Sequence, residues 1–136
     1  MTHVGPIGSG QAVKAVNQVI LAGTYLGVAE GIVLAIKAGL DVDQVVGALS
    51  GGAAQSWVLT NRSGRMTVND YPLGFKVSLH RKDLNIALSM ARELDASLPV
   101  SEMCEQIEAA LMADHHEDDD MSAVARSIRA RSGLES

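Results

Sequence analysis

The sequence predicts an all-α protein of about six helices arranged around one long central helix. Hydrophobic residues make up 47% of the 136 residues, and most are Ala, Val, Leu, Ile or Met, whereas aromatic residues make up only 3%. The β-branched residues lie mostly within longer segments of helical period. One of these segments, residues 11–38, contains no proline and few polar residues. We therefore expect residues 1–136 to form a single helical domain.

The long helix is expected to begin after a glycine-rich entry and to end at Gly39. Ser9 is placed to cap its start, in an entry turn made by Gly5, Pro6, Gly8 and Gly10. Gly39 follows the last apolar residues as a C-terminal cap. Three glycines recur every fourth residue on the face roughly opposite Lys14, namely Gly23, Gly27 and Gly31. Such a stripe predicts close packing of another helix on that face.

The remaining helices are predicted from caps and apolar spacing. Asp41, with Gln44 three residues later, is expected to cap a short helix from Val42 to Leu49. Further helices are expected over residues 54–66, 75–94, 99–112 and 122–131. Trp57 and Leu59 are expected in the core. Residues 69–72 are expected to form a loop. On the helix expected over residues 75–94, an apolar stripe is made by Leu84, Leu88 and Ala91. A second face of that helix is expected to carry Phe75, Ser78, Lys82 and Asn85.

Charge and cysteine content exclude some classes of function. The formal net charge is -5, and the arginines near the end, Arg126, Arg129 and Arg131, are offset by the acidic residues 117–120. A nucleic-acid partner is therefore not expected, because phosphate binding needs a basic face. Cys104 is the only cysteine and cannot form an internal disulfide. It fits a reducing compartment, and we expect a cytoplasmic protein.

Val19 to Ile36 is apolar enough to raise the question of a membrane span. The segment carries Glu30 and three glycines, and no second candidate span follows it. A helix in a protein core is the preferred interpretation, so no membrane partner is expected. A signal peptide fits no better, since the apolar run is too long and lacks a small-residue cleavage site.

Two local patterns resemble binding motifs but lack essential parts. Gly8, Ser9 and Gly10 precede Lys14, but Val13 stands where a dinucleotide fingerprint has its third glycine, and no strand precedes them. His115 and His116 stand beside an acidic run, residues 117–120. Neighbouring ligands in a polar linker point in different directions, so we expect a solvated loop and no metal site.

Lys14 is the residue that most needs an explanation. It lies near the start of the long apolar helix, with Asn17 and Gln18 on the same face. One interpretation is that its side chain extends to solvent from the helix start. The other is that it has a chemical role at a cleft. Periodicity alone does not decide between these two interpretations.

The segment from Gly8 to Asn17, together with the long helix, Phe75 and the Lys82-Asp83-Leu84 sequence, resembles the C-terminal domain of the β-hydroxyacid dehydrogenases. This family includes 3-hydroxyisobutyrate dehydrogenase and tartronate semialdehyde reductase and is related to 6-phosphogluconate dehydrogenase. The resemblance covers nearly the whole chain, from His3 to about Ala123. It implies a helical domain like that of 6-phosphogluconate dehydrogenase.

The resemblance implies roles for six residues. Lys14 matches the catalytic lysine, which protonates the carbonyl oxygen in one direction and takes the hydroxyl proton in the other. A free lysine has a pKa near 10.4, so this role requires burial or a nearby positive charge. Asn17 matches a substrate-orienting residue, and Gln18 stands where relatives often have Asn. Lys82 and Phe75 are expected to contact the cofactor, whereas Asp83 is expected to cap or pair with a neighbour.

The resemblance also implies partners for the domain. NAD or NADP would be bound mainly by an N-terminal Rossmann domain that this chain lacks, and the substrate would be a small hydroxy acid. We therefore expect the chain to be one domain of a longer protein and to be inactive alone. A homodimer is expected, because the family assembles through its helical domains. The alternative is a non-catalytic helical dimerisation or binding module in which the ancestral site is idle.

Overall fold

The structure, a computed structural model, describes residues 9–134 and confirms the all-α prediction for them. This part of the chain forms six α-helices and one short 3₁₀ helix, without a β-strand. The helices are α1 (Ser9–Lys37), α2 (Val42–Leu49), α3 (Trp57–Val68), α4 (Val77–Glu93), α5 (Pro99–Ala113), η1 (Met121–Ala123) and α6 (Val124–Arg131). Residues 5–8 of the predicted entry turn and the capping side chain of Ser9 lie outside the described part, and the prediction was wrong for Gly10, which already lies in α1.

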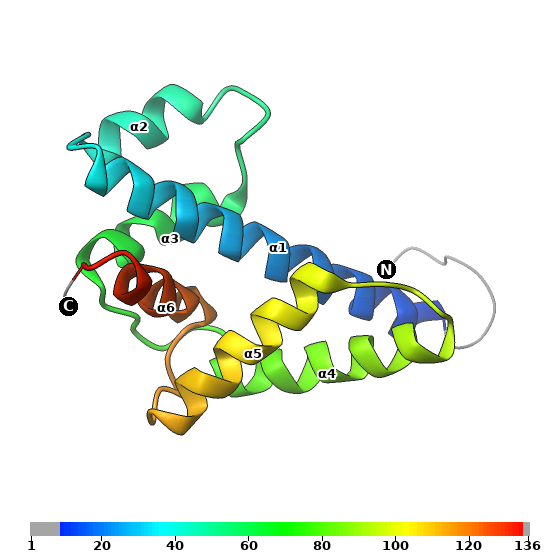
Figure 1. Ribbon diagram of the computed structural model, residues 1–136. Coiled ribbons are helices and arrows are strands. Elements are labelled where there is room, and N and C mark those ends of the chain that lie inside the picture. The colour runs from blue at the N-terminus through cyan, green and yellow to red at the C-terminus, as the bar shows by residue number, and fades with distance from the viewer. Residues whose placement is uncertain (1–8, 135–136) are drawn as a thin grey trace.

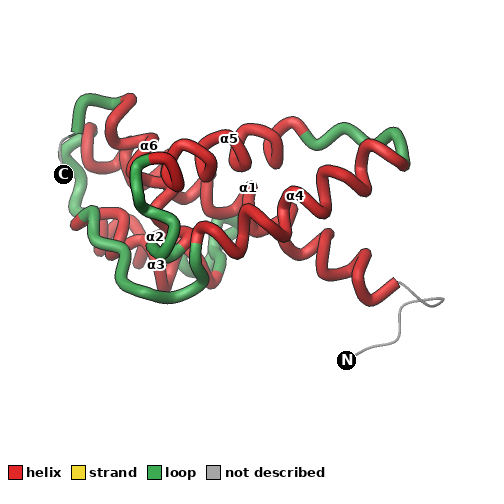
Figure 2. The backbone as a smooth tube through the Cα atoms, turned by 90° about the horizontal axis from the view of Figure 1, so that it is seen from below, coloured by secondary structure: helices red, strands yellow, loops and turns green. Residues whose placement is uncertain are grey.

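Helix α1 is the axis of the molecule. Its 29 residues span roughly 43 Å at the usual rise per residue. Helices α4 and α5 lie along its N-terminal half, α3 and α6 lie along its C-terminal half, and α2 lies on the other side of that end (Figures 1 and 2). All five of these helices contact α1. The prediction of a bundle around one long helix is therefore confirmed.

The caps between α1 and α2 agree with the sequence prediction. Gly39 has a φ of 76°, and the amide of Leu40 donates to the Ala35 carbonyl oxygen at 3.0 Å. Asp41 then caps α2, since its Oδ1 accepts from the Gln44 amide at 3.2 Å. Glycine suits position 39 because other residues adopt a positive φ only at an energetic cost.

Helix α3 begins later than predicted, at Trp57 rather than residue 54. The reason is that the Ser56 hydroxyl caps the helix by accepting from the Leu59 amide at 3.0 Å. Leu59 is buried, as predicted, but the prediction for Trp57 was wrong, because 60% of this residue is exposed. The Arg62 guanidinium lies over the Trp57 ring, 4.6 Å from its centroid, one turn further along α3.

Helix α4 confirms the predicted apolar stripe, with Leu84, Leu88 and Ala91 all buried. Its first residue is Val77, so Phe75 precedes the helix. The prediction that Phe75 shares a helical face with Ser78, Lys82 and Asn85 was therefore wrong, because helical spacing does not extend to it. The last predicted helix is present as two pieces, η1 and α6.

The face of α1 that carries Gly23, Gly27 and Gly31, here called the glycine face, is not covered as predicted. Gly27 and Gly31 are exposed, and a Cβ added to either would meet no described atom within 4 Å outside the helix's own backbone. At Gly23 the nearest such atom is Val100 Cγ1, at 3.8 Å. Within the described chain, the prediction of close helix packing on this face was therefore wrong at Gly27 and Gly31, whereas α5 contacts the face at Gly23.

The acidic run after α5 is not wholly solvated, because Asp120 is completely buried. Its Oδ2 lies 3.2 Å from Arg62 Nε and 3.6 Å from Arg65 Nη1. Its Oδ1 accepts from the Phe75 amide at 3.0 Å, and its Oδ2 accepts from the Ser122 amide at 3.0 Å. The prediction of a solvated loop was wrong at this residue. Asp120 joins α3, the start of α4 and η1.

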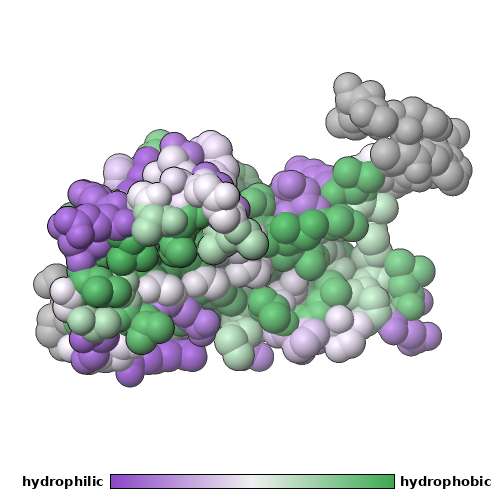
Figure 3. Space-filling model, turned by 90° about the horizontal axis from the view of Figure 1, so that it is seen from above, coloured by the Kyte–Doolittle hydropathy of each residue, from purple (hydrophilic) through white to green (hydrophobic). Residues whose placement is uncertain are grey.

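Helix α1 also passes a length and composition test for a membrane span. Over Gly10–Lys37, an 18-residue window reaches a mean hydropathy of 2.0, and 39% of that window is buried in the protein. The central helix of a bundle passes the same test, since it must be apolar where other helices cover it. The exposed apolar residues of its N-terminal half include Val13, Val16 and Ile20, and apolar side chains gather along α1 in Figure 3.

Candidate active site

A small polar group lies where the N-terminal half of α1 packs against α4. Lys14, Asn17 and Gln18 fall on one face of α1, because residues three and four apart in a helix are neighbours. Asp83 reaches this face from α4. Sequence reasoning expected Asp83 to pair with a neighbour, and the structure shows that its partners come from α1.

Two hydrogen bonds and one ion pair link these four side chains in series. Asn17 Nδ2 donates to Gln18 Oε1 at 3.1 Å, and Gln18 Nε2 donates to Asp83 Oδ2 at 3.0 Å. Lys14 Nζ lies 3.8 Å from the same Asp83 oxygen. Gln18 is only 4% exposed, whereas 68% of the Lys14 side chain is exposed. The buried amide therefore orients Asn17 and Asp83, while the lysine stays free to reach a ligand.

The Lys14 hollow is a surface depression of about 270 Å³ beside this group. Its lining combines polar and apolar side chains, namely Gln11, Lys14, Ala15, Gln18, Asp83, Ile86 and Met90. A charged amine, an amide and a carboxylate beside apolar surface suit a small polar molecule with a carbon backbone. A larger depression, of about 450 Å³, lies between α5 and α6. Its lining contains none of the residues that the sequence predicted to bind substrate or cofactor or to take part in catalysis.

The two predicted cofactor residues lie outside the lining of the Lys14 hollow. Lys82 is exposed on α4, next in sequence to Asp83. Phe75 is half-buried against the core and makes an edge contact with the His80 ring, at 6.1 Å between centroids. The structure thus groups Lys14, Asn17 and Gln18, whereas the assignments of Lys82 and Phe75 to a cofactor stay predictions.

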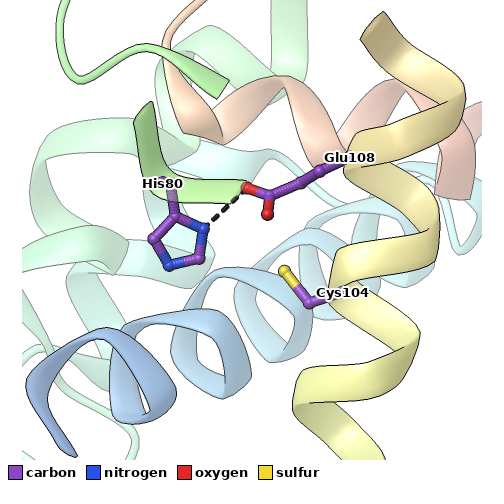
Figure 4. A group of neighbouring side chains, drawn as sticks. All are labelled: His80, Cys104 and Glu108. Atoms are coloured by element: carbon purple, nitrogen blue, oxygen red, sulfur yellow. Dashed lines mark hydrogen bonds and ion pairs between the residues drawn. The ribbon is translucent and has the colours of Figure 1, made fainter. Parts of the chain in front are cut away.

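A buried histidine beneath this group was missed by the sequence analysis. His80 Nε2 lies 3.2 Å from the backbone oxygen of Gln18, and its Nδ1 lies 2.7 Å from Glu108 Oε2 (Figure 4). Neither side chain is exposed. The contacts connect α4 to α1 and α5 directly under the Lys14 face. His80 lies four residues before Leu84 on the buried stripe of α4, and that spacing could have revealed it.

Comparison with known proteins identifies the family. The family described as NAD-binding of NADP-dependent 3-hydroxyisobutyrate dehydrogenase matches residues 8–128. The chain is 38% identical over 128 residues to 2-hydroxy-3-oxopropionate reductase of Escherichia coli, covering 94% of this chain and 44% of that protein. It is 35% identical over 136 residues to a probable 3-hydroxyisobutyrate dehydrogenase of Mycobacterium tuberculosis, covering 95% of this chain and 46% of that protein.

Solved structures agree with the sequence comparison. A crystal structure of 3-hydroxyisobutyrate dehydrogenase from Salmonella typhimurium superimposes with a TM-score of 0.78 at 28% identity, over 88% of this chain and 42% of that one. The M. tuberculosis 3-hydroxyisobutyrate dehydrogenase with L-serine superimposes with a TM-score of 0.85 at 31% identity, over 94% of this chain and 46% of that one. The chain thus spans less than half the length of these relatives. It belongs to the NAD-binding 3-hydroxyisobutyrate dehydrogenase family, and this membership supports NAD(P) as the cofactor.

Proposed function

We propose that this chain is the substrate-side helical domain of an NAD(P)-dependent 3-hydroxyacid dehydrogenase and that Lys14 is its general acid and base. The observation that carries the proposal is the Lys14 hollow, where an exposed ammonium lies beside a fixed amide and a carboxylate. The names of the relatives support a small hydroxy acid as the substrate class.

Each residue of the polar group has a role in this proposal. The nicotinamide supplies or accepts the hydride. Lys14 donates a proton to the carbonyl oxygen during reduction and takes the hydroxyl proton during oxidation. Asn17 keeps one amide hydrogen and its Oδ1 available for substrate, since its hydrogen bond to Gln18 uses a single N–H. Gln18 and Asp83 hold these groups in place from the buried side.

The cofactor would be held mainly by a second, nucleotide-binding domain. In this chain the exposed ammonium of Lys82 suits a negatively charged group of the cofactor. Phe75 is less suited to contact the cofactor, because it is half-buried against the core. Such a division places the proton donor on one domain and the hydride carrier on the other.

The experiment compares the 136-residue chain with the same domain joined to its nucleotide-binding domain, using the absorbance of reduced nicotinamide and a panel of small 3-hydroxy acids. We expect turnover of at least one hydroxy acid by the longer protein and a rate lower by at least about a hundredfold for the chain alone, because catalysis needs both reactants held together. Equal rates for the two proteins would contradict the proposal.

The other candidate function, assembly through the helices, is supported by the uncovered glycine face. A depression of about 380 Å³ lies along this face, between α1 and the segment from α2 to the start of α3. Gly27 and Gly31 border it, and a Cβ added to either would meet no described atom within 4 Å outside the helix's own backbone. We propose that a second copy of the chain packs there and that the protein is a homodimer.

Light scattering at micromolar concentration is expected to give the mass of a dimer. Gly27→Arg should convert it to a monomer, because the new side chain would project from the glycine face. Gly64→Arg on α3 is the matched control, since Gly64 is equally exposed and has no described neighbour at its Cβ position. A monomeric native protein would contradict the dimer, as would a Gly27→Arg variant that remains dimeric.

A further inference from the structure

Three side chains with metal-binding atoms meet in the interior, at a place that the proposed reaction does not use. His80 comes from α4, and Cys104 and Glu108 come from adjacent turns of α5 (Figure 4). All three are 0% exposed. One imidazole nitrogen, the thiol sulfur and one carboxylate oxygen lie within 4.8 Å of one another. These residues are called the buried trio below.

The hydrogen bonds of His80 leave its Nδ1 facing the trio. The backbone oxygen of Gln18 can only accept, so Nε2, at 3.2 Å from it, carries a hydrogen. Nδ1 and Glu108 Oε2, at 2.7 Å, then share one proton between them. Metal-bound histidines in proteins donate from one ring nitrogen to a carbonyl group and coordinate through the other, and His80 Nδ1 could coordinate in this way once the shared proton leaves.

Glu108 also has an oxygen without a partner. Its Oε1 is buried and makes no hydrogen bond to any described residue. An unpaired buried carboxylate oxygen is costly, and proteins normally satisfy such atoms with a donor or a cation. This second observation indicates that the trio lacks a ligand.

We propose that His80 Nδ1, Cys104 Sγ and the Glu108 carboxylate form a binding site for a zinc-class divalent cation. Nitrogen, sulfur and oxygen donors together suit Zn²⁺ and Co²⁺ rather than Mg²⁺ or Ca²⁺. Zinc–ligand bonds of about 2.0–2.3 Å place neighbouring ligands of a tetrahedron roughly 3.3–3.8 Å apart. The present separations, 2.7 Å between His80 and Glu108 and up to 4.8 Å within the trio, require only small side-chain shifts.

The exchange of protons for metal balances the buried charge. Burial raises the pKa of the Cys104 thiol and of Glu108, because it disfavours their charged forms. A divalent cation would replace the thiol proton and the proton shared by His80 and Glu108. The two positive charges of the metal then match one thiolate and one carboxylate, and the trio stays neutral overall. The fourth coordination position is left for a water molecule.

The charged side chains next to the buried trio bind each other and do not occupy the proposed cation site. Arg81 on α4 and Glu105 on α5 lie next to the trio and bind each other, with Arg81 Nη2 at 2.8 Å from Glu105 Oε1. On α1 the group that faces His80 is the uncharged backbone oxygen of Gln18. The trio can therefore bind a cation without breaking the ion pairs around it.

The test uses Co²⁺ as a coloured substitute for Zn²⁺. The purified protein is unfolded in urea under reducing conditions and refolded with Co²⁺, because the site is closed in the folded state. We expect about one tightly bound cobalt per chain and a thiolate-to-cobalt charge-transfer band in the near ultraviolet. Cys104 is the only cysteine, so this band reports the trio alone. Absence of the band in native protein refolded with excess Co²⁺ would overturn the proposal.

Two variants separate the trio from adventitious surface binding. Cys104→Ser should lose the band and most of the bound metal. The double variant His115→Gln/His116→Gln removes the two neighbouring histidines in the loop after α5. It should keep both the charge-transfer band and the bound metal. If this double variant lost the metal while Cys104→Ser retained it, the trio would be only a metal-free contact between α4 and α5. Because the band is read on the native protein, the test holds even if Cys104→Ser fails to fold.

Discussion

If the chain functions as proposed, replacing Lys14 with alanine in the protein that joins it to a nucleotide-binding domain is expected to lower kcat by about 10²–10⁴-fold, with a much smaller effect on KM. The reason is that the substrate carbonyl oxygen would lose its proton donor, whereas Asn17 and the residues that line the Lys14 hollow would still bind the substrate. Steady-state kinetics with reduced nicotinamide and a small keto or semialdehyde acid measure this effect. Stability should change little, because most of the Lys14 side chain is exposed.

Lys14→Arg is the control that distinguishes proton transfer from simple charge. Arginine keeps the positive charge near Asp83 but does not give up a proton at neutral pH. If Lys14 acts as acid and base, this variant should be nearly as slow as Lys14→Ala. A variant with arginine that retained most of the native kcat would indicate that Lys14 only attracts the substrate carboxylate.

Replacing Asp120 with alanine is expected to lower the free energy of unfolding by about 3–5 kcal/mol. Arg62 and Arg65 would lose the buried carboxylate that they share, and the amides of Phe75 and Ser122 would lose an acceptor. Breaking one side of a buried ion pair costs much more than breaking an exposed one, because the remaining charges stay without compensation. Urea unfolding followed by circular dichroism measures the change.

Asp118→Ala is the matched control for Asp120, two residues away in the same acidic run. The Asp118 side chain is 74% exposed and, among residues 9–134, forms its ion pair with Lys76 Nζ, at 3.3 Å. Its replacement should therefore cost less than about 1 kcal/mol. Equal losses for the two variants would show that the structural assignment of Asp120 is wrong.

The parts of the fold that local sequence determines were predicted well. Gly39, Asp41 and Gln44 are close in sequence, and their caps depend only on nearby backbone groups. The apolar stripe of α4 was predictable for the same reason, because helical periodicity is a local property. These features fix where helices begin and end.

Features that depend on contacts between helices were not predicted. Trp57 has the composition of a core residue, but it stands at the exposed start of α3 and stacks with Arg62. Asp120 belongs to an acidic run that suggests solvent exposure, and only the positions of Arg62 and Arg65 on α3 explain its burial. Local sequence does not contain the information that brings Asp120 to these arginines or that leaves Trp57 exposed.

The candidate site shows the same division. The grouping of Lys14, Asn17 and Gln18 follows from helical spacing on α1, and the resemblance to the dehydrogenases drew attention to it. The contact with Asp83 lies 65 positions further along the chain from Gln18 and depends on how α1 packs against α4. The buried trio depends likewise on the packing of α4 against α5.

The most direct measurement of the central claim is chemical rescue of the Lys14→Ala variant by small primary amines. If the lysine ammonium is the proton donor, methylamine or ethylamine should restore part of kcat, because each can occupy the space left by the side chain and donate a proton. The same amines should not restore an Asn17→Ala variant, which loses an orienting amide instead. Absence of rescue in a Lys14→Ala variant that has lost its activity, or equal rescue of both variants, would contradict the assignment of Lys14 as general acid and base.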